Sequence, residues 1–407
     1  MTDSGAGAEA SLGRRALLLG GAVAAAGALA SCGPDRPEPP GAAKPAPLYG
    51  EHQPGVLAEP APAAVVASAN VLAAGRGELA ELFKTITERI RTLASGKAPM
   101  STGIGDVPAD SGTLGPTPEP SGLTVTLGVG ASLFDGRYGL AGRKPARLAR
   151  MEAFEGDELD PAWCHGDLSL VVAAQSQDAT LRALRDIARH TRGAMQLNWK
   201  IDGATAPPRP DGAPRNHFGF KDGTANPDPA NAGEMDRLVW AAPDDQAWTK
   251  GGSYQVVRLI RMLVEFWDRI SIGEQEQIFG RDRASGAPLT GNAETDDPDY
   301  ASDPAGKVIP LTSHIRLANP RDPETDDSRI LRRAYNYSRG LDSNGNLDLG
   351  LVFTCYQQDV ERQFAAVQRR LVGEPLADYI RNFGGGYFFA LPGARDERDW
   401  LGRGLLA

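Results

Sequence analysis

Residues 350–371 read GLVFTCYQQDVERQFAAVQRRL, and within this stretch the pattern of apolar residues changes its period. Residues 350–356 form a continuous run of mainly apolar and β-branched side chains, which favours a buried strand. From residue 359 onward, apolar residues recur at helical spacing: Val360, Phe364, Val367 and Leu371. The apolar residues 387–391 (YFFAL) predict another strand. This part of the chain therefore predicts a strand–helix–strand unit.

The same order of elements occurs earlier in the chain. Strands are predicted at 65–70, 123–129, 167–174 and 253–262, and helices at 78–94, 179–192 and 265–278. Residues 202–250 are rich in Pro, Gly, Asp and Asn, which predicts a long irregular segment between two halves. The sequence thus predicts an α+β fold of two packed modules, which we place at residues 54–235 and 236–407.

The composition limits the class of protein. The chain has 407 residues, of which 41% are hydrophobic, so it can form a substantial core. Its net charge of −9 argues against a nucleic-acid-binding protein, which would present a basic face. The three cysteines, Cys32, Cys164 and Cys355, lack the spacing of zinc ligands. Cys164 and Cys355 fit two buried free thiols beside apolar runs, and one disulfide is the alternative.

Residues 11–32, SLGRRALLLGGAVAAAGALASC, are typical of an export signal. Arg14 and Arg15 precede a short, mildly apolar run, which indicates the twin-arginine type. Residues 29–32 fit a lipobox with Cys32 as the first mature, lipid-bearing residue, and residues 28–30 fit an ordinary cleavage site as the alternative. We assign residues 1–32 to the signal and the residues 33–53, rich in Pro and Ala, to a tether. An extracytoplasmic protein is expected, held at the membrane if Cys32 is lipidated and otherwise secreted or periplasmic.

Histidine is scarce, with five residues in the chain. No two of them have the spacing of metal ligands, but an axial haem ligand needs only one imidazole. His314 lies among apolar residues, with Arg316 and Arg321 near enough in sequence to meet a haem propionate. An ordinary histidine in a basic loop is the alternative interpretation of this segment.

Two further clusters contain residue types suited to chemistry. Residues 219–227, GFKDGTANP, have glycines that let the backbone approach a planar cofactor, although turns produce the same pattern. In residues 330–337, ILRRAYNY, two arginines stand between apolar and aromatic side chains. A strand here would direct one of Arg332 and Arg333 inward and the other outward.

Taken together, FKDGTANP (220–227), SHIRLANPR (313–321) and LRRAYNYS (331–338), in this order, resemble the dye-decolourising peroxidase family. The resemblance covers residues 55–405 and is to the twin-arginine-exported branch that includes the deferrochelatase/peroxidases. It implies one haem b per chain. It also implies two ferredoxin-like modules in a dimeric α+β barrel arrangement, with the haem in the C-terminal module.

The resemblance also implies roles for individual residues. His314 would be the proximal iron ligand, Asp222 the distal acid and Arg332 the distal arginine, with Arg333 as the alternative. Other residues are expected to lie against the haem or the peroxide: Gly223, Thr224, Ala225, Asn319, Pro320, Arg321, Leu351 and Phe353. Asp378 is expected to supply the carboxylate that orients His314.

The implied activity is reduction of hydrogen peroxide with oxidation of bulky organic donors such as dyes. Asp222 would move a proton between the two peroxide oxygens while Arg332 stabilises the developing charge. Because the reference pKa of aspartate is about 4, an acidic pH optimum is expected.

Two other functions remain open. One is an iron-acquisition lipoprotein that releases iron from haem, and the other is a non-catalytic binding lipoprotein, which would not account for Asp222 with Arg332. The expected partners are peroxide, an organic donor, iron-uptake proteins, a second copy of the chain and, through Cys32, a membrane.

Overall fold

The computed structural model describes residues 46–96, 103–116, 118 and 121–407, so the predicted signal, Cys32 and most of the tether lie outside the described residues. The strands are β1 (Ala63–Val71), β2 (Thr124–Gly130), β3 (Leu168–Ala174), β4 (Met195–Ala204), β5 (Ser253–Met262), β6 (Leu331–Arg332), β7 (Tyr335–Leu341), β8 (Leu347–Gln357) and β9 (Ile380–Ala390). The α-helices are α1 (Pro54–Leu57), α2 (Arg76–Ala94), α3 (Gln177–His190), α4 (Ala232–Leu238), α5 (Val264–Trp267), α6 (Ile272–Phe279), α7 (His314–Ala318), α8 (Ala366–Arg370) and α9 (Arg403–Leu406).

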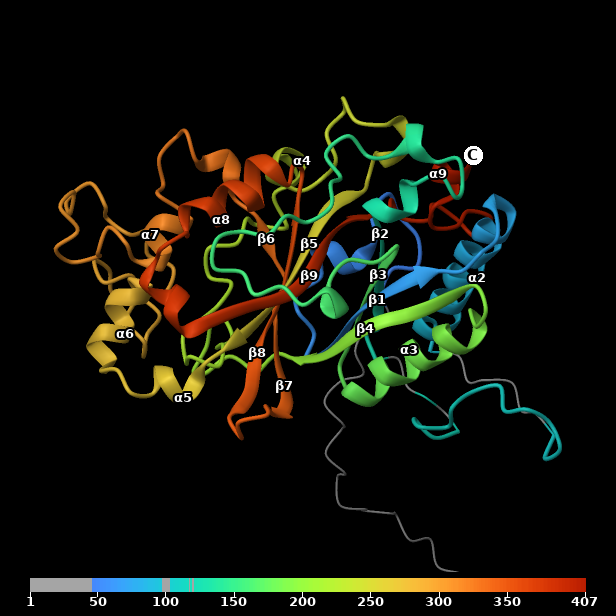
Figure 1. The fold of residues 1–407 in the computed structure, drawn as a ribbon, viewed down its shortest axis with the longest axis horizontal. Helices are drawn as coiled ribbons and strands as arrows, with labels where there is room; N and C mark the ends of the chain where they lie inside the picture. The colour runs from blue at the N-terminus through green and yellow to red at the C-terminus, as the bar shows by residue number, and fades with distance from the viewer. Residues whose placement is uncertain (1–45, 97–102, 117, 119–120) are drawn as a thin grey trace, which may run out of the picture. The chain divides into compact units, whose positions relative to one another are not determined.

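Eight of these strands close into an antiparallel barrel. Their order is β5-β9-β2-β3-β1-β4-β7-β8, and β8 also pairs with β5, while the short β6 pairs with the end of β8. Closure satisfies the backbone groups that an open sheet would leave at its edges. Figure 1 shows the strands in the middle of the described chain, with α2 and α3 to one side and α6, α7 and α8 to the other.

Each half of the barrel repeats one topology. The first half has the strand order β4-β1-β3-β2 and the second β9-β5-β8-β7, and in both a helix follows the first strand and another follows the third. This is the ferredoxin-like β-α-β-β-α-β motif. The halves join where β2 pairs with β9 and β4 with β7. The predicted α+β fold of two ferredoxin-like modules is confirmed, and the boundary between residues 235 and 236 stays a prediction.

Strands β1, β2 and β3 of the first half are buried on both faces because both faces are covered. Val65 of β1 packs in the same cluster as Phe83 and Ile86 of α2. The next residue, Val66, points the other way and packs with Trp199 and other apolar residues in a separate cluster. Strands with two buried faces read as continuous apolar runs, as they do here.

Two of the predicted helices differ from the prediction in the structure. The segment predicted as one helix over 265–278 forms two, α5 and α6, because Ser271 caps a new helix by accepting a hydrogen bond from Glu274 N at 3.2 Å. The helix predicted at 359–371 begins with a π-helical turn over Glu361–Ala365 before α8. β4 was not predicted, because its sequence is rich in polar residues.

The end of the predicted tether is packed against the barrel. Gln53 is buried, and its side chain donates to Leu127 O and Leu391 O, both at 2.8 Å. Its Oε1 accepts from Leu127 N at 2.8 Å. These bonds join the segment before α1 to β2 and to the chain after β9.

Both described cysteines are free, with Cys355 buried in β8 and Cys164 partly buried. The expectation of two free thiols is confirmed, and the disulfide alternative is wrong. None of the helices in the described ranges combines the length and the apolar character needed to cross a bilayer.

Candidate active site

A cavity beside the second half of the barrel brings together motif residues that are far apart in sequence. Asp222, from the loop after β4, His314 of α7 and Arg332 of β6 all line it. Most of the remaining wall is apolar and includes Phe220, Ile260, Met262, Phe279, Leu351, Phe353, Phe364 and Leu376.

Most of the other predicted contact residues also line this cavity. They are Thr224, Ala225, Asn319, Arg321, Leu351 and Phe353. Gly223 lines an adjoining cavity that is also lined by Asp222 and Arg332. Pro320 is not part of either wall.

The imidazole of His314 is oriented by a carboxylate. Its Nδ1 lies 2.8 Å from Oε2 of Glu374, whose side chain is buried. Because a carboxylate accepts hydrogen bonds, this contact assigns the proton to Nδ1 and leaves the lone pair on Nε2. Burial opposes protonation of the ring, but the charge and the hydrogen bond of Glu374 outweigh it and raise the pKa of His314.

Glu374, and not Asp378, occupies the position that was expected of the orienting carboxylate. Asp378 is exposed on the turn Pro375–Tyr379, so the assignment to Asp378 is corrected. After α8 the chain turns at Gly373, which has a φ of 77°, and the next residue is Glu374. No local sequence signal marked Glu374, because its contact with His314 spans 60 residues of the chain.

The short helix α7, which presents His314, is held from both sides. Arg370 of α8 donates to Leu317 O and Ala318 O, each at 3.0 Å, and so satisfies carbonyls at the end of α7. At the other side, a Cβ on Gly280, the residue that ends α6, would lie 2.8 Å from Ile315 Cγ1. Glycine at this position therefore permits the close approach of α6 to α7.

Asp222 and Arg332 form an ion pair at the cavity wall, with 2.9 Å between Oδ1 and Nη1. Arg333 is not part of the main cavity wall but lines the adjoining cavity; its side chain is buried and donates to Leu57 O at 2.9 Å and to Arg332 O at 3.0 Å. The alternation expected of a strand thus directs Arg332, and not Arg333, into the main cavity.

Asn226 attaches the Asp222 loop to the backbone of Arg332. Its Oδ1 accepts from Arg332 N at 3.0 Å and its Nδ2 donates to Arg332 O at 3.1 Å. The amide thus pairs with Arg332 on the edge opposite to β8, as a neighbouring strand would. Both bonds require an amide side chain, because Nδ2 supplies the donor and Oδ1 the acceptor.

For the activity with peroxide that the sequence resemblance implies, we expect Asn226→Ala to lower the rate by up to about 10²-fold, because small displacements of positioned groups have effects of this size. Asn226→Asp should be at least as harmful, since it removes the donor and brings a charge to a carbonyl oxygen. The measurement is the rate of peroxide reduction per bound haem. Asn198→Ala is the control, because Asn198 also exchanges two amide bonds, with Asn70, on the exposed surface. Equal rates in Asn226→Ala and Asn198→Ala would contradict the positioning role.

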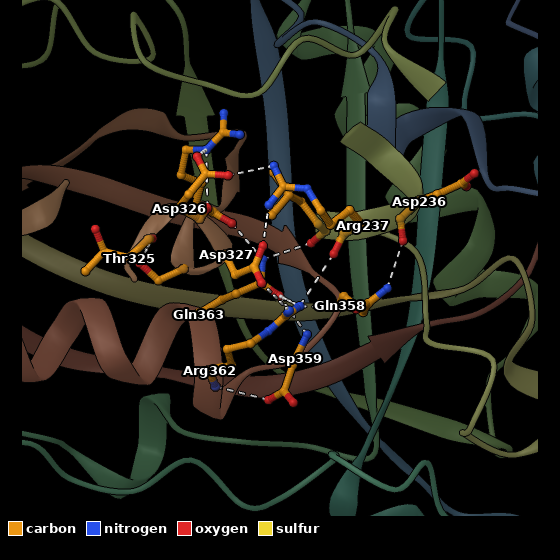
Figure 2. Close-up of polar contacts among 12 residues, drawn as sticks. Asp236, Arg237, Thr325, Asp326, Asp327, Gln358, Asp359, Arg362 and Gln363 are labelled. Atoms are coloured by element: carbon orange, nitrogen blue, oxygen red, sulfur yellow. Dashed lines mark hydrogen bonds and ion pairs between the residues drawn. The ribbon is translucent and has the colours of Figure 1, made fainter. Parts of the chain in front are cut away.

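A polar network fixes the loop at residues 319–330, which forms part of the cavity wall. Figure 2 shows Arg237 of α4 bonded to Asp326 and Asp327, with 2.8 Å between Arg237 Nη2 and Asp326 Oδ2. Gln363 donates to Leu238 O at 2.9 Å and to Arg329 O at 2.6 Å. The loop is therefore tied to α4 and to the π-helical turn before α8.

Glu294 joins a second loop to the Asp222 loop, and sequence reasoning missed it. Its carboxylate accepts from Lys221 Nζ at 2.5 Å, Thr224 Oγ1 at 2.8 Å and Ala213 N at 3.0 Å. Burial alone would raise the pKa of Glu294. The hydrogen bonds from Lys221, Ala213 and Thr224 outweigh burial, so the pKa of Glu294 is lowered. No periodicity or motif in this irregular segment indicated the contact.

The donor set of the cavity fits a haem. One imidazole with a free Nε2 lies on an apolar wall, and the described residues contain no group of three or more His, Cys, Asp or Glu suited to a metal ion. A single imidazole is too few ligands for a bare metal site but is enough for the axial position of haem. The residues present therefore suit a planar, mostly apolar cofactor with one coordinating nitrogen.

Comparison with known proteins agrees with this geometry. The family model "Dyp-type peroxidase, N-terminal" matches residues 53–205, and "Dyp-type peroxidase, C-terminal" matches residues 213–395. The chain belongs to the Dyp-type peroxidase family. It is therefore similar in sequence to enzymes, and the peroxidase expected from the motifs is confirmed at the level of the family.

Individual relatives of this Dyp-type peroxidase fall in two groups. Deferrochelatases of Escherichia coli (strain K12) and Shigella flexneri are each 50% identical to it over 367 residues, which is 88% of this chain and 87% of theirs. A DyP-type peroxidase from Cellulomonas bogoriensis has a TM-score of 0.80 at 35% identity, covering 89% of this chain and 99% of that one. Ferric DtpA from Streptomyces lividans has a TM-score of 0.80 at 33% identity, covering 90% and 98%.

In this Dyp-type peroxidase, we expect Glu374→Gln to lower haem retention or activity by about 10- to 100-fold, the usual effect of losing a group that orients a metal ligand. The neutral amide makes His314 a weaker base, so the reduction potential of the bound iron should rise. Haem content, activity and potential are measured together. Glu324→Gln, at an exposed position, is the control. An unchanged potential would contradict the role of Glu374.

Proposed function

We propose that this protein is a haem b peroxidase, with one haem per chain, that reduces hydrogen peroxide and oxidises bulky organic donors such as dyes. The observation that carries the proposal is the cavity that combines the ion pair of Asp222 and Arg332 with the oriented imidazole of His314. Nε2 of His314 would hold the iron. Thr224, Ala225, Asn319 and Arg321 would line the porphyrin, which when bound supplies the iron centre at which peroxide is reduced.

The residues of the chain provide proton transfer and charge stabilisation. The carboxylate of Asp222 accepts a proton from one peroxide oxygen and returns it to the other, which leaves as water. Arg332, held 2.9 Å from Asp222, stabilises the negative charge that develops on the departing oxygen. Leu351 and Phe353 give the adjacent wall an apolar surface. We propose an acidic pH optimum for this reaction.

A second function is release of iron from haem, with iron-uptake proteins as partners. It is supported by the curated relatives named deferrochelatase, which are 50% identical over most of this chain. Both functions need the cavity and His314. They differ in whether haem remains as the cofactor or is consumed as the substrate.

We propose export by the twin-arginine route for residues 1–32, with Cys32 as a lipid anchor or, alternatively, cleavage just before it. Support comes from the paired Arg14 and Arg15 ahead of a mild apolar run. The twin-arginine route carries proteins that fold before crossing, and this suits a chain that would acquire haem in the cytoplasm. The protein would then act outside the cytoplasm.

The deciding experiment measures oxidation of the dye and the state of the porphyrin at the same time, in the haem-loaded protein. A peroxidase oxidises the dye only when peroxide is present and keeps its iron porphyrin through many turnovers. Iron release instead yields metal-free protoporphyrin in proportion to the haem supplied. His314→Ala is the control for binding in the cavity. A protein that takes up no haem would refute both functions.

A further inference from the structure

Arg281, two residues after the end of α6, is a buried cation without a counter-ion among the described residues. Its residue exposure is 7%, and it lies on the cavity wall. Nη1 donates to two carbonyls, Gly286 O at 2.6 Å and Glu294 O at 2.9 Å. Within the described part of the chain it forms no ion pair with a carboxylate. Burial lowers the pKa of Arg281, which reflects the cost of an uncompensated charge.

The other long cationic side chains on this wall all have acidic partners. Lys221 pairs with Glu294, Arg258 with Asp157, Arg321 with Asp297, Arg329 with Glu234 and Arg332 with Asp222. Asp297 is 79% exposed, so Arg321 is only weakly neutralised. The part of the wall at Arg281 and Arg321 therefore has a surplus of positive charge.

A neutral hydrogen-bond donor lies in the same part of the wall. Tyr300 lines the cavity, and its hydroxyl is buried with no hydrogen-bond partner in the described ranges. Burial raises the pKa of Tyr300 to about 12, against the opposing charges of Arg321 and Arg281, so the phenol remains protonated at neutral pH. A guanidinium without a counter-ion and a phenol without an acceptor match a carboxylate.

The surroundings indicate how such a carboxylate reaches the site. Arg281 and Arg321 also line a second cavity next to the first, whose wall carries five carboxylates: Glu294, Asp296, Asp297, Asp322 and Asp326. Negative charge on that side opposes the entry of small free anions. The apolar main cavity instead favours a carboxylate attached to a large apolar body.

We propose that Arg281 and Tyr300 bind a propionate carboxylate of the porphyrin and so fix the orientation of the haem in its cavity. The proposal rests on the proposed haem function. It adds an anion-binding group that the sequence motifs did not include. The ligand chemistry is a carboxylate on a planar apolar ring.

The test compares haem with its dimethyl ester, which has the same ring and iron but no free carboxylate. Each is loaded into the full protein, and its loss to an excess of apomyoglobin is timed by absorbance. The wild-type protein should lose haem more slowly than it loses the dimethyl ester. Arg281→Gln should speed the loss of haem by roughly tenfold to a hundredfold, the range for a charge-assisted hydrogen bond, and leave loss of the ester almost unchanged.

Tyr300→Phe separates ligand binding from loop structure, because Arg281 also holds two loop carbonyls and Tyr300 does not. It should speed haem loss by several-fold and leave the ester unaffected. Arg329→Gln is the control, since Arg329 lines both cavities but already has acidic partners. Equal acceleration of haem and ester in both Arg281→Gln and Tyr300→Phe, or no acceleration in either, would overturn the proposal. A wild type that retains neither porphyrin would refute the haem function itself, and this inference with it.

Discussion

Asp222→Asn is expected to slow the reaction with peroxide by roughly 10²- to 10⁴-fold, the contribution typical of a positioned proton-transfer group. Asparagine has nearly the same shape as aspartate and can still accept a hydrogen bond from Arg332. It cannot take up a proton at any working pH. The loss should therefore fall on the chemical step, with haem content unchanged, and rapid mixing of the haem-loaded protein with peroxide measures it.

Two arginine variants test the arginine side of the ion pair between Asp222 and Arg332. Arg332→Leu should also lower the peroxide rate, by about 10²-fold or more, because a charge that stabilises the departing oxygen is lost. Arg333→Gln is the matched control, since Arg333 is adjacent in sequence but bonded to Leu57 O and Arg332 O. Its peroxide rate per bound haem should stay within a few-fold of wild type. If Asp222→Asn kept wild-type rates with haem retained, the proton-transfer role of Asp222 would be wrong.

Asp157→Asn is expected to produce the largest loss of stability, about 3–5 kcal/mol in the free energy of unfolding, the usual effect of leaving one buried charge unpaired. Asp157 pairs with Arg258 of β5, and both side chains are 1% exposed. Arg258 also has a buried Nε without a partner among the described residues, and its guanidinium lies 5.6 Å from the Phe154 ring centroid, a cation–π contact weaker than an ion pair. Little protein or solvent is therefore available to compensate the guanidinium once Asp157 is neutral.

Denaturant unfolding at matched haem content measures this prediction. Replacing both partners, Asp157→Leu with Arg258→Met, should recover most of the lost stability, because a buried pair can often be exchanged for apolar groups of similar volume. Glu81→Gln, in an exposed pair with Lys84, should change stability by less than about 0.5 kcal/mol. A wild-type unfolding midpoint in Asp157→Asn would show that the pair does not support the fold.

Much of the fold was predictable because its strands and helices are apolar in regular patterns. The strand predicted at 253–262 matches β5 over the same residues, and the helix predicted at 78–94 matches α2 to within two residues. Prediction failed where a polar contact overrode the pattern. Ser271 caps a second helix within a segment whose apolar pattern predicts a single helix. The polar sequence of β4 did not predict a strand, although its residues alternate in burial in the structure.

The sequence predicted those residues of the site that belong to its motifs and missed most of the others. Asp222, His314 and Arg332 are in short, distinctive segments, so the amino-acid sequence alone indicated them. Glu374, Glu294 and Asn226 act through contacts with residues distant in sequence, and Arg281 through its burial on the cavity wall. Nothing in their local segments distinguishes a buried carboxylate at an imidazole from an exposed one.

The sequence by itself determined the α+β class and the repeated order of strands and helices, and its family resemblance indicated Asp222, His314 and one of the adjacent pair Arg332 and Arg333. Only the tertiary structure decided that Arg332 and not Arg333 faces the cavity, that Glu374 and not Asp378 orients His314, and that Arg281 lacks a counter-ion within the described residues. The physical reason is that periodicity and motifs are local properties of the chain. Burial, ion pairing and hydrogen-bond satisfaction depend on which distant residues closure of the barrel brings together.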